Sequence, residues 1–185
     1  MKNLVKLFFA TLVMVAISAN TFAQTNANAN VAASATVLTA LTITNNHAVA
    51  FGNVSATTPG VVFLDPQGTS NAYVGSTAAI GTFSIAGALN QSIRLTWPPN
   101  IALTHSTDNL NYVLAVSGYA TDVQASSTDL TLTSGHSDVT TDGTAGTYFL
   151  YVGGSLGGSS TTPAALSSQA AGTYTGTANF TVEYN

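Results

Sequence analysis

The chain contains no cysteine in its 185 residues and very few charged residues. The lack of cysteine excludes disulfides, a thiol nucleophile and thiolate metal sites. Only three residues are basic, and two of them, Lys2 and Lys6, lie at the extreme N-terminus. A chain with so little positive charge has no basic patch for phosphates, so we expect no nucleic-acid partner and no docking on anionic lipid.

The first 23 residues have the features of a signal peptide. Lys2 and Lys6 give a positive start, an uncharged and mostly apolar stretch covers 7–17, and the small residues Thr21 and Ala23 precede Gln24. The apolar stretch is too short to span a bilayer, which takes about 20 residues. We therefore predict export through the periplasm to the cell surface or the medium. After removal of 1–23 we expect no membrane span.

The rest of the chain shows the period-two alternation of half-buried β-strands. Ile93, Leu95 and Trp97 alternate with polar residues, and the run 148–152 is apolar on both faces, as in a central strand. Turn formers separate eight to ten such stretches, including Gly153-Gly154, and 153–170 is expected to be a loop with one edge strand at most. The pattern predicts an all-β domain over 37–185, a single antiparallel immunoglobulin-like β-sandwich, with a barrel as the lesser alternative.

No pattern of catalytic residues is present. There is no lysine after the predicted signal peptide, and only one glutamate, Glu183. We therefore expect neither an enzyme nor a cofactor. The histidines are scattered in polar, turn-like contexts, which favours surface imidazoles; they are His47, His105 and His136.

Two binding sites stay open at this stage. Asp129, Asp138 and Asp142 bracket one hairpin-like stretch and could hold calcium, but solvated turn aspartates explain them equally well. Trp97 could form a sugar-stacking platform with nearby tyrosines. Its place in the same row as Ile93 favours a core position instead.

The chain after residue 23 begins with an unusually long alternating segment. The register holds over 27–43, about 55 Å of extended chain, whereas strands of such domains usually have about 5–6 residues. Residues 37–43 suit a first strand of the domain, which leaves an N-terminal extension over 24–36. Such an extension can pair with the edge of another molecule. Its candidate donor positions are Ala27, Ala29, Val31, Ala33 and Ala35.

The C-terminus supplies a possible counterpart. From Gly172 onward the apolar residues fall on one face, and the chain stops directly after this stretch. A terminal strand without a successor can leave an edge open. The candidate acceptor edge consists of Gly172, Tyr174, Phe180, Val182 and Tyr184.

Both ends resemble those of chaperone–usher pilin subunits, particularly the spore-coat-U-like group. In those proteins a glycine fourteen residues from the end and a penultimate tyrosine mark the last strand, and Gly172 and Tyr184 match both positions. The segments 35–45 and 50–54 also look like the opening of such subunits. They are still more similar to a related secreted bacterial family known only as a domain of unknown function.

The resemblance implies an incomplete sandwich whose missing strand comes first from a periplasmic chaperone and then from the extension of the next subunit. The expected partners are thus other copies or related subunits. Two features differ from such pilins: the donor positions are nearly all alanine, which buries little apolar area, and the common cysteines are absent.

Two functions follow from these observations. The first is a cell-surface structural protein, a pilin-like fibre or matrix subunit that assembles by β-strand donation. The alternative is a self-contained secreted β-sandwich that binds glycan or protein, with 24–36 as a linker.

Overall fold

The computed structural model describes residues 29–159, 162–163, 166 and 169–185. The predicted signal peptide, 1–23, and the start of the predicted extension, including Ala27, lie outside the described residues. Residues 37–185 form one compact unit, and the fold described below is that of this unit.

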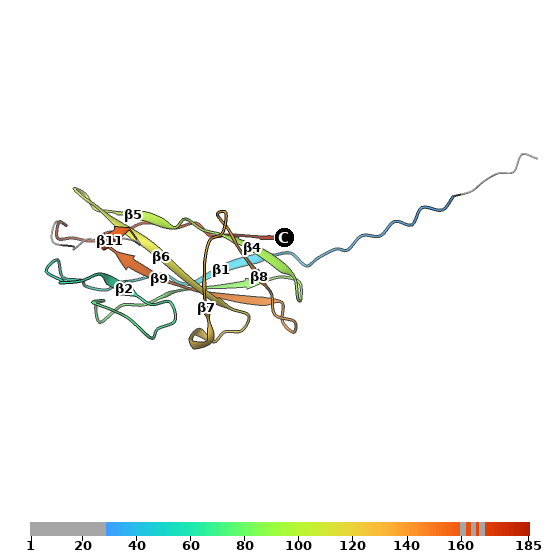
Figure 1. Cartoon of the computed structure of the whole chain (residues 1–185), viewed down its shortest axis with the longest axis horizontal. Coiled ribbons are helices and arrows are strands. Elements are labelled where there is room, and N and C mark those ends of the chain that lie inside the picture. The colour runs from blue at the N-terminus through green and yellow to red at the C-terminus, as the bar shows by residue number, and fades with distance from the viewer. Residues whose placement is uncertain (1–28, 160–161, 164–165, 167–168) are drawn as a thin grey trace, which may run out of the picture. The chain divides into compact units, whose positions relative to one another are not determined.

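The larger sheet has seven antiparallel strands. Its main order is β1-β3-β9-β6-β5, while β2 pairs with β9 and β7 pairs with β6 (Figure 1). The strands are β1 (Thr42–His47), β2 (Val62–Leu64), β3 (Gly81–Ala86), β5 (Asn100–Thr104), β6 (Asn109–Tyr119), β7 (Thr128–Leu130) and β9 (Thr147–Leu156).

A smaller sheet has the order β12-β4-β8, again antiparallel, so that the C-terminal strand β12 is an edge strand. Its strands are β4 (Ser92–Thr96), β8 (Ser137–Thr140) and β12 (Thr181–Tyr184). A short hairpin of β10 (Gly158–Ser159) and β11 (Thr162–Pro163) and the 3-10 helix η1 (Gln124–Ser126) complete the elements.

The two sheets pack face to face around one main core. Ile93 and Leu95 of β4 belong to the same buried cluster as Ile85 of β3 and Leu150 of β9. The alternation in the sequence explains this arrangement, because every second side chain of a strand points to the same face. The expected antiparallel β-sandwich is confirmed, and β9, which contains the run 148–152, lies between β3 and β6 as expected.

Two expectations about strand limits are wrong. The first strand begins at Thr42 rather than Val37, whose side chain is exposed. Gly153-Gly154 is not a turn, because β9 continues through both glycines to Leu156. The glycines are needed there for close packing: a Cβ on Gly153 would meet the Leu64 carbonyl, and one on Gly154 would meet the Val113 carbonyl.

Candidate functional site

An apolar groove of about 790 Å³ lies in the sandwich. Two segments far apart in sequence form its walls: 47–54, which begins at the last residue of β1, and 169–178, which precedes β12. Among the described residues that line the groove there is no Asp, Glu, Lys or Arg. Its large apolar lining residues include Phe51, Phe83, Tyr112, Leu114, Tyr174 and Phe180.

The C-terminal wall is bonded along one edge only. Thr175 exchanges main-chain hydrogen bonds with Thr104 of β5, at 2.8 and 3.1 Å. Neighbouring residues of an extended segment direct their N–H and C=O groups to opposite edges, so those of Tyr174 and Gly176 face away from β5. Within the described chain, no main-chain hydrogen bond is assigned to residues 176–180. This wall therefore has a free main-chain edge.

Main-chain hydrogen bonds also tie the N-terminal wall to the rest of the domain. Ala50 exchanges two main-chain hydrogen bonds of 2.8 Å with Ala79, and the Phe51 carbonyl accepts one of 2.8 Å from Gly75. Neither Ala79 nor Gly75 lines the groove. Both walls are thus tied to the rest of the domain by residues that do not line the groove.

Aromatic side chains form the floor. Phe51 and Tyr112 make an edge-to-face contact with ring centroids 5.2 Å apart. Phe83 lies 4.8 Å from Phe180, which in turn stacks on Trp97 at 6.0 Å. These separations are those of rings in direct contact. Phe51, Phe83 and Phe180 remain only half-buried, because the groove exposes them.

The turn between β5 and β6 holds one end of the C-terminal wall. The Asp108 carboxylate accepts a hydrogen bond from the Ala170 amide at 3.2 Å and lies 3.4 Å from the Tyr174 hydroxyl. Hydrogen bonds from the amides of Ala170 and Asn109 hold the pKa of Asp108 below its ordinary value. Burial and the nearby Asp108 raise the pKa of Tyr174, whose ring lies 5.2 Å from that of His105.

The structure brings three of the five predicted acceptor residues to the groove. Gly172, Tyr174 and Phe180 line it, whereas Val182 and Tyr184 lie beyond it on β12. The Tyr184 hydroxyl accepts a hydrogen bond from the Ala88 amide at 2.6 Å and donates one to the Thr39 carbonyl at 2.7 Å.

The structure describes four of the five predicted donor positions. Four of them are exposed and belong to no strand, namely Ala29, Val31, Ala33 and Ala35. The fifth, Ala27, lies outside the described residues.

Sequence reasoning did not assign the N-terminal wall to the site. The segment 50–54 carried part of the family resemblance, but its alternation is interrupted at Gly52, which has a φ of +69°. The sequence offered one signal for this wall: the apolar residues Val49, Phe51 and Val54, which lie beyond the end of β1.

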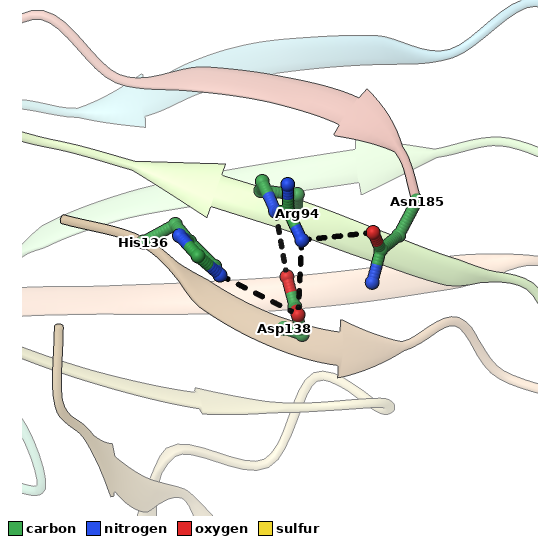
Figure 2. Close-up of polar contacts among 4 residues, drawn as sticks. All are labelled: Arg94, His136, Asp138 and Asn185. Carbon is green, nitrogen blue, oxygen red and sulfur yellow. Dashed lines mark hydrogen bonds and ion pairs between the residues drawn. The ribbon is translucent and has the colours of Figure 1, made fainter. Parts of the chain in front are cut away.

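The only basic residue outside the predicted signal peptide, Arg94, lies in a polar cluster on the smaller sheet (Figure 2). Its Nε is 3.1 Å from Asp138 Oδ1, and its second guanidinium nitrogen donates to the side chain of Asn185 at 2.9 Å. His136 Nε2 is 3.7 Å from Asp138 Oδ2. The hydrogen bond from Arg94 lowers the pKa of Asp138. The cluster links β4, β8 and the last residue, so we assign it a structural role.

The three aspartates considered for calcium do not come together. Asp129 lies on β7 of the larger sheet and Asp138 on β8 of the smaller one, while Asp142 accepts amide hydrogen bonds from Thr144 and Ala145 in a turn. Across the described part of the chain, no group of three His, Asp or Glu side chains is placed to hold a metal ion. Trp97 is 5% exposed and belongs to the core, so it provides no sugar platform.

Fold and site together define an antiparallel β-sandwich with a groove between the segments 47–54 and 169–178, whose described lining contains no Asp, Glu, Lys or Arg. The chain belongs to the family described as Domain of unknown function (DUF4402), whose model matches residues 41–184. No curated protein and no solved structure is significantly similar to it. Among the described residues, no helix is long and apolar enough to cross a membrane.

Proposed function

We propose that the protein is a structural subunit of the cell surface that assembles by β-strand donation. The observation that carries the proposal is the groove, whose C-terminal wall has a main-chain edge without partners among the described residues. Unpaired N–H and C=O groups beside an apolar floor are what an added β-strand satisfies, since it supplies both hydrogen bonds and side chains.

The extension over 24–36 has the properties of such a strand. Residues 27–35 alternate in period two and contain no charged residue. The groove also lacks charged side chains among its described lining, so an uncharged occupant avoids the cost of burying an unpaired charge. Its odd positions would face the floor, and its even positions, largely Asn, Ala and Ser, would face away.

The donated strand comes from a second molecule. Three residues, 36–38, separate Ala35 from Thr39, whose carbonyl Tyr184 binds. Fully extended, these steps span about 14 Å. The near end of the groove, at Phe180, lies four residues or about 13 Å from Tyr184 along an extended chain. Since β1 runs toward the groove, an extension entering its own groove would also have to reverse its direction within these few residues, which favours a second molecule as the donor.

Donation between molecules produces an open-ended chain of subunits. Because the donor segment and the acceptor groove are different surfaces, each contact leaves another donor and another groove free. The resemblance of both chain ends to chaperone–usher pilins supports this reading, and so does the predicted signal peptide. On this proposal the protein is exported and a periplasmic chaperone covers the groove in transit.

Size-exclusion chromatography with light scattering tests the proposal on two purified forms. One begins at Gln24, and the other lacks 24–36. We expect the longer form to give a series of oligomers and the shorter form to remain monomeric. Two stable monomers with equal melting temperatures would contradict strand donation and favour the alternative, a self-contained β-sandwich that binds glycan or protein.

A further inference from the structure

We propose that the groove selects a donor strand with small side chains, and that the alanine-rich extension of a second copy is its specific ligand. This inference rests on the proposed function and adds its specificity. The extension lacks bulky residues, and on this proposal that lack is the feature that the groove recognises.

The floor already contains the large side chains that a donor would otherwise supply. Below one part of the groove Phe51 packs on Tyr112, and below another Phe83 packs on Phe180. Phe180 is fixed from beneath by Trp97, which is buried. A side chain entering above Phe180 therefore meets a ring that is backed by a buried tryptophan.

The core under these rings is closed as well. Val152 and Leu156 line the groove and are 1% and 4% exposed, and Leu150 in the same strand is fully buried. Inserting extra methylene groups into such packing forces side chains off their rotamers. On this proposal a methyl group is accommodated above the rings, whereas a leucine or phenylalanine side chain has to displace one of them.

The extension matches this requirement at every inward position. Four of its five candidate donor residues are alanine, and the fifth, Val31, is the smallest of the branched aliphatic residues. The main-chain hydrogen bonds to the two walls then supply much of the attraction, and the alanines supply the fit. Discrimination against other exported strands comes from the clash that bulky side chains make with the floor.

The test uses the whole chain from Gln24 to Asn185 and enlarges one donor position at a time. The variants Ala29→Leu, Ala33→Leu and Ala35→Leu are compared with Ser34→Leu, which adds the same side chain on the opposite face. We expect each inward leucine to raise the concentration needed for assembly by roughly tenfold or more, and Ser34→Leu to leave it nearly unchanged.

A compensating change in the floor makes the test specific. Combined with Phe51→Ala, one of the inward leucines should regain assembly, because the lost ring leaves space for it. The position that is rescued gives the register of the strand. Melting temperatures of the unassembled subunits show that each variant folds.

The possible failures can be told apart. If the parent chain does not assemble, the proposed function is wrong and the inference falls with it. If the parent chain assembles and the inward leucine variants assemble as well or better, strand donation stands and selection for small side chains is wrong. Equal effects of Ser34→Leu and the inward variants would also contradict the inference.

Discussion

At the scale of single residues, Asp65 shows how a buried charge is accommodated. It is 6% exposed, and its carboxylate accepts hydrogen bonds from the amides of Gln67, Thr69 and Ser70 and from the Thr69 hydroxyl, at 2.8–3.0 Å. Burial alone would raise the pKa of Asp65, but these hydrogen bonds outweigh it and lower the pKa below the usual value. The charged form is therefore stabilised in the folded state.

We predict that Asp65→Asn lowers the free energy of unfolding by about 2–3 kcal/mol at pH 7. Because the folded pKa of Asp65 is lowered, its stabilising effect is complete above the unfolded pKa and is lost as the pH falls through the folded one. Urea unfolding of the parent protein and of Asp65→Asn should thus show a difference in unfolding free energy that disappears below about pH 4. The control Asp129→Asn, at an exposed position, should change stability by no more than about 0.5 kcal/mol. A gap that is independent of pH would contradict this account of Asp65.

At the scale of elements, β2 is the smallest strand of the larger sheet that supplies core residues. It has three residues, and Val62 and Leu64 are 0% and 2% exposed. Its pairing with β9 occurs beside Gly153, where a Cβ would meet the Leu64 carbonyl, so the glycine lets the two backbones approach closely. A strand this short is held mainly by the side chains that it buries.

We predict that Leu64→Ala costs about 2–5 kcal/mol of stability, because it leaves a cavity in the core. Leu89→Ala removes the same atoms from a side chain that is 49% exposed and should cost no more than about 0.5 kcal/mol. Denaturant midpoints at constant slope provide the measurement. A loss below about 1 kcal/mol for Leu64→Ala would mean that β2 does not pack into the core.

The sequence predicts those elements whose pattern is local. The row Ile93, Leu95, Trp97 is buried as expected, and the C-terminal row from Tyr174 to Tyr184 is half-buried at each predicted inward position. Period-two alternation suffices for such strands because one face is packed and the other is solvated.

The features that escaped prediction depend on distant partners. Gly153-Gly154 looks like a turn until the carbonyls of Leu64 and Val113 are placed against it. The wall formed by 47–54 is likewise defined by a segment more than a hundred residues away. Alternation shows which side chains of a strand share a face, but not which segment lies beside that strand. The sequence could therefore single out the C-terminal segment but not the wall formed by 47–54.

At the scale of the whole molecule, the domain and its extension have complementary chemistry. The groove offers an unpaired main-chain edge on its C-terminal wall and an aromatic floor without charges among its described lining, and the extension offers an uncharged alternating segment of small residues. The absence of cysteine makes this relation testable by covalent trapping, since any cysteine introduced is the only one in the chain.

The most direct measurement mixes two single-cysteine forms of the chain from Gln24 to Asn185 under mild oxidation. One carries Ala178→Cys in the groove, and the other carries a cysteine in the extension, at positions 27–35 in turn. Strand donation predicts disulfide-linked pairs for one or more of the inward positions, Ala27, Ala29, Val31, Ala33 and Ala35, and none for the intervening Asn28, Asn30, Ala32 and Ser34. No linked pair at any position, or equal linking at inward and outward positions, would contradict the central claim that a second copy fills the groove.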